Sequence, residues 1–450
     1  MEIFNINDFK IVNLDKDNIL FFHPATLQIY PLKKNNIIAE VLQTTHMCGW
    51  NVAITKFGED VCQQVISYIN RTIANAPSTI YSDIKTDVYQ PYFDVVVLPI
   101  AGMCNLNCPY CFAQTDGGFN FPNFTEKDID KVVSFVMDTQ INANRKSTSF
   151  VFFGGEPLLK FDIIKYTVSY IKQKYPNRSV GFSITTNGTI INDEIIDYFK
   201  QNNFLILLSL DGPDNEFNLR KYQDGRKSID IVMQNIEKLR KEEVSIELRA
   251  TLINTNPYIV ETFDFFEKLQ CPFTVVFAYQ SENKMHQELS MYNESVLQSI
   301  REQLDDLLAY YRERACRGES IYSKIINDAK KSFDRRIGHY IPCTSGRQYF
   351  TITADGNIFS CAHLMNNPLF RMGSINNGIT SPESYLPPKV TDIVECNKCW
   401  ARMMCSGGCV TQKISTGMKN TTPMTYNGCE LERIKWEFYL KMYYYIEKKM

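Results

Sequence analysis

The segment that decides the fold is FDVVVLPIAGMCNLNCPYCF, residues 93–112, in which an apolar run leads into three closely spaced cysteines. The apolar run, Phe93–Pro99, has the character of a β-strand. Cys104, Cys108 and Cys111 follow it in a CX3CX2C pattern. Because α/β folds carry their chemistry at the carboxyl ends of strands, the sequence predicts a reactive loop at this position.

The chain as a whole has the composition of a globular protein, with 44% hydrophobic and 22% charged residues among 450. This length predicts two or three domains. The 48 basic and 50 acidic residues nearly cancel, which disfavours a nucleic-acid partner. No apolar run is long enough to span a bilayer, and residues 1–18 do not resemble a signal peptide. We therefore expect a cytoplasmic protein with no membrane partner.

Cysteine is the unusual residue type, with 14 copies. Cytosolic thiols stay reduced, so closely spaced cysteines indicate a metal site rather than disulfides. Neighbouring thiolates repel one another unless a cation or cluster takes up their charge. Beyond the first loop, seven cysteines crowd the C-terminal part of the chain: Cys343, Cys361, Cys396, Cys399, Cys405, Cys409 and Cys429. The other four are isolated, and we interpret them as packing residues: Cys48, Cys62, Cys271 and Cys316.

The number of cysteines in the first loop indicates which kind of metal site it forms. Structural zinc sites also use CX2C pairs, so zinc is the alternative for the C-terminal set. A 4Fe–4S cluster takes four thiolates, whereas Cys104, Cys108 and Cys111 offer three. One iron would then lack a protein ligand, and an open coordination position is typical of a reactive metal site. The sequence therefore favours an iron–sulfur cluster in this loop.

A second segment is FVFFGGEPLL, residues 150–159. Together with the CX3CX2C loop, it resembles the radical S-adenosylmethionine (SAM) enzymes. In that family the open iron binds SAM, and reductive cleavage of SAM releases a 5′-deoxyadenosyl radical that abstracts hydrogen. The resemblance implies that Gly154, Gly155 and Glu156 contact the methionine amino group. Two glycines let the backbone approach a ligand closely, and a carboxylate accepts hydrogen bonds from an ammonium.

Two further segments resemble later strands of that family: residues 181–188, which end in Thr-Asn-Gly, and residues 204–213, which contain Ser-Leu-Asp-Gly. The resemblance implies other SAM contacts: Tyr110 near the adenine, Ser209 and Asp211 at the carboxylate or ribose, and Arg249 at the carboxylate. The alternatives are a simple turn at Asp211, a solvated or paired charge at Arg249 and plain packing of Tyr110.

The predicted fold class is α/β. Such a fold needs helices between its strands, and apolar residues recur at three- and four-residue steps in four segments: residues 128–138, 163–174, 191–202 and 229–241. This alternation predicts a parallel sheet with helices outside. The resemblance implies a partial (β/α)6 radical SAM barrel at residues 91–300, followed by a helical bridge at residues 301–342.

The C-terminal cysteines resemble those of the SPASM domain in their spacing, and we place that domain at residues 343–430. It binds two auxiliary 4Fe–4S clusters, so the resemblance implies three clusters in all. One auxiliary cluster would have four ligands: Cys396, Cys399, Cys405 and Cys429. The other would have three: Cys343, Cys361 and Cys409. Its fourth ligand would be Cys316, a non-protein ligand or a thiol of the substrate, as in relatives that build thioether bridges.

The two ends of the chain lie outside the predicted barrel and SPASM domain. Residues 1–85 contain three strand candidates and then two helical patterns: residues 10–14, 18–22, 28–32, 36–44 and 58–74. This order resembles the winged-helix-like domain that binds a leader peptide by adding it as a strand to its sheet. A plain cap on the barrel is the alternative. Residues 72–91 would form a linker, and residues 431–450 a C-terminal helix.

These predictions together describe a radical SAM/SPASM peptide maturase of the thioether-forming sactipeptide or ranthipeptide type. It would abstract hydrogen from a precursor peptide with a leader sequence and form Cys-derived thioether cross-links, with an electron donor such as flavodoxin or ferredoxin. Formylglycine formation, as in anaerobic sulfatase maturases, and carbon–carbon cross-linking of a peptide are alternatives. Sulfatase maturases carry an acidic residue after the second SPASM cysteine, where this chain has Ala362. An electron-transfer or zinc-scaffold protein is the non-enzymatic alternative.

Overall fold

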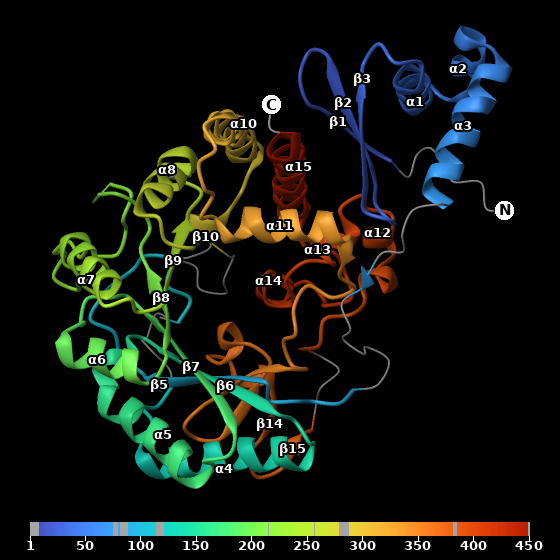
Figure 1. Ribbon diagram of the computed structural model, residues 1–450. Helices are drawn as coiled ribbons and strands as arrows, with labels where there is room; N and C mark the ends of the chain where they lie inside the picture. The colour runs from blue at the N-terminus through green and yellow to red at the C-terminus, as the bar shows by residue number, and fades with distance from the viewer. Residues whose placement is uncertain are drawn as a thin grey trace.

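The computed structural model describes residues 9–74, 80–81, 89–113, 121–214, 216–255, 257–278, 288–380 and 385–448. A large sheet lies at its centre (Figure 1). In spatial order this sheet consists of β10 (Phe273–Phe277), β9 (Ile246–Leu252), β8 (Leu205–Ser209), β7 (Ser179–Thr186), β6 (Ser147–Gly154), β5 (Val95–Ala101), β12 (Tyr349–Ile352), β13 (Asn357–Phe359), β14 (Arg371–Ser374) and β15 (Gly378–Ile379).

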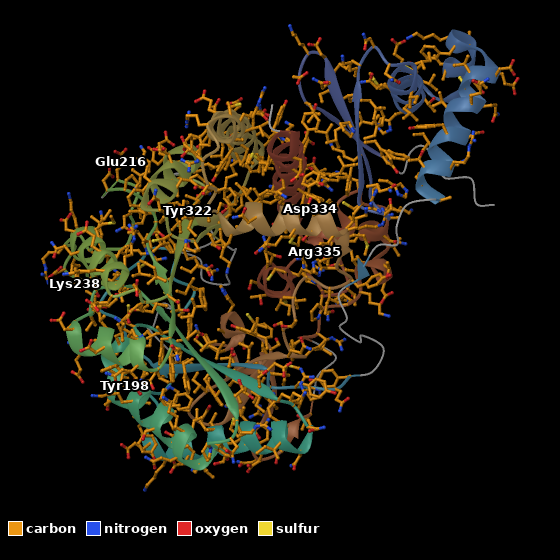
Figure 2. The ribbon with its side chains drawn as sticks, in the orientation of Figure 1. Tyr198, Glu216, Lys238, Tyr322, Asp334 and Arg335 are labelled. Carbon is orange, nitrogen blue, oxygen red and sulfur yellow. The ribbon has the colours of Figure 1, made fainter. Side chains whose placement is uncertain are left out.

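The strands from β5 to β10 run parallel to one another. Helices connect them and lie on the outer side of the sheet (Figure 1): α4 (Glu126–Asn142), α5 (Phe161–Lys174), α6 (Asp193–Gln201), α7 (Ile229–Lys241) and α8 (Ile259–Leu269). Tyr198 on α6 and Lys238 on α7 mark this outer surface (Figure 2). The predicted α/β fold with a partial barrel is confirmed, and the helix predicted at residues 229–241 coincides with α7.

Helix α4 shows how local sequence sets these elements. Thr125 and Asp128 form a capping box that satisfies backbone donors at its first turn. The buried side chains then recur at helical spacing along one face, at Ile129, Val132 and Val136. Burying such apolar side chains contributes about 2 kcal/mol each. The helix is therefore held against the sheet by one face and begins at a defined residue.

Strand β12 was not predicted, and it joins the C-terminal region to the barrel. It pairs in parallel with β5, so that Tyr349 lies opposite Val95 and Thr351 opposite Val97. The sheet then continues through the antiparallel strands β13, β14 and β15. The region that holds the C-terminal cysteines is therefore fixed beside the strand that leads into the first cysteine loop.

The N-terminal region contains a separate antiparallel sheet and three helices: β1 (Lys10–Asn13), β2 (Asn18–His23), β3 (Gln28–Lys33), α1 (Ile37–Cys48), α2 (Trp50–Phe57) and α3 (Glu59–Ala74). Helix α2 was not predicted; Gly49, with φ +92°, separates it from α1. The two faces of β2 alternate, because Phe21 packs with the three helices whereas Phe22 packs toward the rest of the chain. The Phe22 ring lies 6.3 Å from the ring of Phe333.

The predicted helical bridge consists of α10 (Glu294–Cys316) and α11 (Lys324–Arg335). The predicted C-terminal helix is α15 (Tyr426–Lys448), which begins earlier than expected and so includes Cys429. The predicted linker at residues 72–91 is partly wrong, since α3 continues to Ala74 and β4 (Ile80–Tyr81) pairs with β11 (Ile337–Gly338). Among the described residues, no helix has both the length and the apolar character needed to cross a bilayer.

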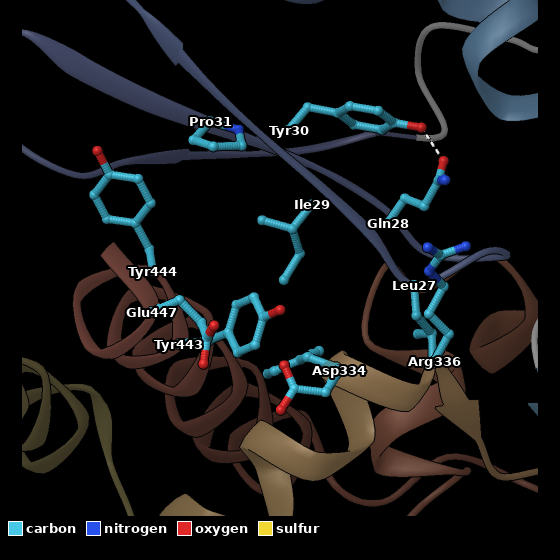
Figure 3. A pocket seen from close by; sticks show the side chains of 11 residues that line it. Leu27, Gln28, Ile29, Tyr30, Pro31, Asp334, Arg336, Tyr443, Tyr444 and Glu447 are labelled. Carbon is cyan, nitrogen blue, oxygen red and sulfur yellow. Dashed lines mark hydrogen bonds between the residues drawn. The ribbon is translucent and has the colours of Figure 1, made fainter. Parts of the chain in front are cut away.

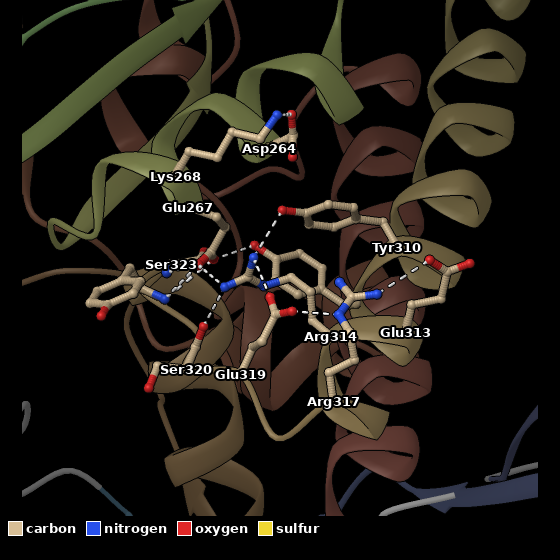
Figure 4. A network of polar contacts seen from close by, with 12 residues as sticks. Asp264, Glu267, Lys268, Tyr310, Glu313, Arg314, Arg317, Glu319, Ser320 and Ser323 are labelled. Atoms are coloured by element: carbon tan, nitrogen blue, oxygen red, sulfur yellow. Dashed lines mark hydrogen bonds and ion pairs between the residues drawn. The ribbon is translucent and has the colours of Figure 1, made fainter.

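A buried carboxylate ties the bridge to the barrel. Glu267 on α8 accepts hydrogen bonds from the Tyr311 hydroxyl at 2.7 Å and from the Tyr322 backbone N–H at 3.0 Å. The Arg314 guanidinium lies 3.5 Å from the same carboxylate (Figure 4). Buried charges are tolerated when they are paired and hydrogen-bonded. Glu267 therefore fixes α10 and the start of α11 against α8.

Candidate active site and cysteine clusters

The first cysteine loop lies at the carboxyl end of β5. Burial raises the pKa of the Cys104 and Cys108 thiols to about 12, and Cys111 adds to both shifts. The three sulfur atoms are thus close enough to influence one another electrostatically. The Leu106 N–H donates to Cys104 Sγ at 3.4 Å. Buried thiols of this kind ionise when a metal supplies positive charge, so the loop fits an iron–sulfur cluster.

Gly154 and Gly155 bring the end of β6 against this loop. The Gly155 N–H donates to Ala101 O at 2.8 Å, and the Glu156 N–H donates to Met103 O at 2.8 Å. A Cβ atom on Gly155 would lie 2.1 Å from Met103 O, and one on Gly154 would lie 2.5 Å from Ala101 O. The sequence interpretation assigned these glycines to approach of a ligand. The backbone contact with the cysteine loop is a second reason that side chains are not tolerated here.

Glu156 follows β6 and is fully buried against the turn that follows β7. Its carboxylate accepts hydrogen bonds from the Thr186 hydroxyl at 2.7 Å, the Asn187 N–H at 2.8 Å and the Leu158 N–H at 3.0 Å. Burial raises its pKa to about 7. A carboxylate has about four acceptor sites, so capacity for one further donor remains. The Asn187 side chain also reaches Cys104 Sγ, at 3.8 Å, which links this turn to the cysteine loop.

Tyr110 and Asp211 meet at a buried ion pair. The Tyr110 hydroxyl donates to the Asp211 carboxylate, and Arg220 Nε lies 3.1 Å from the same group. The Arg220 guanidinium lies 5.4 Å from the centre of the Tyr110 ring. Sequence reasoning did not single out Arg220, because one arginine in a polar loop carries no pattern that marks it. These contacts hold Tyr110, which lies between two loop cysteines, in one position.

Ser209 and Arg249 lie opposite each other on β8 and β9. Ser209 is buried. Burial lowers the pKa of His363 to about 3, and the charge of Arg249 adds to the shift. The His363 ring stacks on Phe112, with 3.5 Å between ring centres. The segment after Cys361 therefore contacts the segment after Cys111, and Arg249 faces this junction.

The four-cysteine cavity forms near the C-terminus. Its cysteines belong to or flank α12 (Val394–Asn397), α13 (Arg402–Cys405) and α15: Cys396, Cys399, Cys405 and Cys429. All four line one cavity of about 260 Å³. Ser406, with φ +57°, is buried beside Cys405, and its hydroxyl has no hydrogen-bond partner within the described residues. The donor set and the space between its members fit a cluster.

The second trio consists of Cys343, Cys361 and Cys409. Burial raises the pKa of the Cys361 thiol to about 12, and the other two cysteines add to the shift. The Thr411 side chain is hydrogen-bonded to both Cys361 and Cys409 and lowers the pKa of each. These sulfur atoms therefore also share one neighbourhood. In the described parts of the chain, no three His, Cys, Asp or Glu side chains are close enough to hold a single metal ion; a cubane, being larger, separates its ligands further.

Cys316, proposed as a possible fourth ligand, lies exposed at the end of α10, and Cys48 is exposed at the end of α1. The packing interpretation is therefore wrong for these two residues. It is confirmed for Cys62 and Cys271, which are buried.

The central part of the chain is similar in sequence to known proteins. The model of the radical SAM superfamily matches residues 98–266. A serine-type anaerobic sulfatase-maturating enzyme of Bacteroides thetaiotaomicron is 30% identical over 195 residues, 42% of this chain and 47% of that protein. The radical SAM cyclopropyl synthase TigE of Paramaledivibacter caminithermalis is 26% identical over 368 residues, 75% of this chain and 72% of that protein. The chain spans about half the length of the first of these relatives.

Solved structures extend the likeness in fold beyond that domain. Native anSMEcpe with bound AdoMet superposes with a TM-score of 0.65 at 20% identity, covering 76% of this chain and 96% of that one. Streptococcus suis SuiB bound to precursor peptide SuiA superposes with a TM-score of 0.52 at 16% identity, covering 94% and 98%. Residues 98–266 are therefore a radical SAM domain, in a chain that is homologous to SPASM-type maturases and shares their fold.

Proposed function

We propose that this protein is a radical SAM enzyme that forms Cys-derived thioether cross-links in a ribosomally made precursor peptide. The observation that carries the proposal is the pairing of β12 with β5. It fixes the region that holds the second trio beside the strand that leads into the first cysteine loop. Each of these two sets of three cysteines is one ligand short of a complete 4Fe–4S site. The first would leave an iron open to SAM, and the second would leave an iron open to a peptide thiol.

The cofactors in this proposal are three 4Fe–4S clusters and SAM. Cys104, Cys108 and Cys111 would hold the first cluster, and the four-cysteine cavity and the second trio would hold the auxiliary clusters. When bound, the first cluster and SAM supply the 5′-deoxyadenosyl radical that removes hydrogen from the peptide. The chain's own part is to place the reacting groups in line and to exclude water.

Individual residues have separate parts in that placement. Glu156 has one acceptor position left for the methionine ammonium of SAM. Ser209 and Arg249 are neighbours across β8 and β9 and would bind the SAM carboxylate. Asp211 already binds Arg220 and Tyr110, so a contact from Asp211 to the ribose would use its remaining acceptor capacity. Gly154 and Gly155 keep the end of β6 close to the cysteine loop.

The N-terminal region, residues 1–85, would bind the leader of the precursor peptide. Strand β3 is an edge strand of the three-stranded sheet. A cavity of about 280 Å³ lies between β3 and helices α11 and α15, and Figure 3 shows Ile29 and Pro31 facing Tyr443 across it. An extended leader peptide would add to such an edge through main-chain hydrogen bonds and place alternate side chains beside it. The rest of the chain would then consist of the barrel (residues 91–300), the helical bridge (residues 301–342), the SPASM domain (residues 343–430) and the C-terminal helix (residues 431–450).

Formylglycine formation is the second candidate, and the sulfatase-maturating relatives favour it. Ala362, which follows Cys361, argues against it, because the carboxylate expected at that position is missing. Carbon–carbon bond formation is a further alternative, because one relative is named a cyclopropyl synthase.

Mass spectrometry of a co-expressed, cysteine-containing precursor peptide tests the proposal. A thioether removes a hydrogen pair per bridge and leaves the cysteine unreactive toward alkylating reagents. A product that reacts with hydrazides would instead be an aldehyde and would establish formylglycine formation. A product that loses hydrogen while its cysteine still alkylates would establish carbon–carbon coupling. Iron and sulfide analysis after anaerobic reconstitution should give three clusters per chain.

A further inference from the structure

Lys413 is an unusual buried cation. It lies on α14 (Val410–Ser415), one turn after Cys409, and is 1% exposed. Its Nζ donates a hydrogen bond to Asn420 O at 3.2 Å. Among the described residues, no carboxylate lies within ion-pair distance of it. Burying an ammonium costs several kcal/mol unless an opposite charge compensates it. The fold therefore places a positive charge where some other group must supply the negative charge.

The groups near Lys413 are cysteines of both C-terminal sets. A Cβ atom on Gly407 would lie 3.9 Å from Lys413 Nζ, and Gly407 lines the four-cysteine cavity. Burial lowers the pKa of Lys413, while Cys396, Cys405, Cys429 and Cys409 act in the opposite direction. The first three of these cysteines belong to the cavity, and Cys409 belongs to the second trio. Lys413 thus lies beside the four-cysteine cavity and one helical turn from Cys409 of the second trio.

We propose that Lys413 is the shared counter-charge of the two auxiliary clusters and makes both of them easier to reduce. The inference rests on the proposed function, because it requires clusters at both sites. Each cluster takes up one electron and gains one negative charge, and no bond forms or breaks. A cation held in a low-dielectric interior stabilises the more negative state. Lys413 is a positioning residue here, since it acts through the clusters.

The test is a potentiometric titration with dithionite, followed by electron paramagnetic resonance of the reconstituted enzyme. In Lys413→Met the ratio of reduced to oxidised auxiliary cluster at a fixed potential should fall about tenfold, a shift of about 59 mV for a one-electron couple. In Lys413→Arg the auxiliary clusters should be reduced at the same potentials as in the unaltered protein, because arginine keeps the positive charge. Lys419→Met is the matched control, since Lys419 is exposed in the same segment. It should leave the reduction potentials of the auxiliary clusters unchanged. The reduction potential of the cluster at Cys104 should not change in any of these variants.

The outcomes separate the inference from the proposed function. If the unaltered protein holds only one cluster, the auxiliary sites themselves are wrong. If three clusters are present and Lys413→Met titrates like the unaltered protein, only the role of Lys413 is overturned. Should Lys413→Met fail to fold, Lys413→Gln replaces it as the neutral variant. Equal potentials for Lys413→Gln and Lys413→Arg would then overturn the inference.

Discussion

The cysteine loop after β5 and the four-cysteine cavity are built in opposite ways. The loop takes its cysteines from residues 104–111, and the end of β6 fixes it through backbone hydrogen bonds. The cavity takes three of its cysteines from residues 396–405 and the fourth, Cys429, from α15, and an open space lies between the four. The barrel therefore shapes the first site without help from a metal. We expect the second site to depend more than the first on its occupant to hold its walls together.

The largest expected effect is that of Cys104→Ala. Without this ligand the first cluster is lost, and 5′-deoxyadenosine formation should fall more than about 1,000-fold, or about 4 kcal/mol in barrier height. Cys405→Ala is the matched control from the four-cysteine cavity and should leave SAM cleavage measurable. Equal loss in both variants would show that the two sites are not independent. Chromatography of 5′-deoxyadenosine under anaerobic conditions gives the measurement.

Removal of iron by a chelator should act unequally on the two regions. We expect amide hydrogen exchange around residues 394–429 to accelerate by at least about tenfold, because that region loses the group that joins its helices. Exchange in β5 to β8 should change little, since hydrogen bonds between these paired parallel strands hold them. Uniform acceleration across both regions would contradict the contrast drawn here.

Gly155→Ala tests how tightly the first site is built. The added Cβ would lie 2.1 Å from Met103 O, a contact that only a backbone shift relieves. We expect a loss of about 3 kcal/mol in the free energy of unfolding, measured by urea denaturation. Gly318→Ala is the control, because nothing lies within 4 Å of the Cβ position of Gly318, whose only obstacle to a side chain is its positive φ of +70°. That variant should cost about 1 kcal/mol.

Glu156→Gln should change the pH dependence of stability in the cluster-free protein. Burial raises the pKa of Glu156 from 4.5 to about 7, so the folded state favours the protonated form. Its contribution to stability is therefore complete below pH 4.5 and is lost as the pH rises through 7. Between about pH 5 and about pH 8 the unaltered protein should lose about 2 kcal/mol from this group.

Urea unfolding at the two pH values measures the difference. Glu156→Gln should remove most of that decline, because glutamine does not titrate. Glu194→Gln, at an exposed position on α6, is the control and should leave the decline in place. An identical pH profile for Glu156→Gln and the unaltered protein would mean that Glu156 does not titrate as its burial implies.

Local patterns made much of the fold predictable. Helix α7 follows from apolar residues at helical spacing, and the strands of the N-terminal sheet follow from short apolar runs between turns. The spacing of the cysteines made the three sets visible. Helix α2 escaped notice, because its apolar residues continue the pattern of α1 and only the φ of Gly49 separates the two.

Contacts between distant segments were not predictable in the same way. The pairing of β12 with β5 depends on tertiary packing, and no local pattern in Tyr349–Ile352 names its partner. Arg220 and Lys413 acquire their importance only through burial beside charged or ionisable neighbours. A sequence shows that such residues are basic, whereas the structure shows which charges they face.

The β5–β12 pairing also limits how the protein can be divided. A shortened protein that ended before Tyr349 would leave one side of β5 without a neighbour, and its sequence VVVLPIA is almost wholly apolar. Exposed apolar strand edges recruit other chains and aggregate. We therefore expect the barrel to aggregate when it is produced alone. Any chimera with a new C-terminal region must first supply a strand that covers this edge.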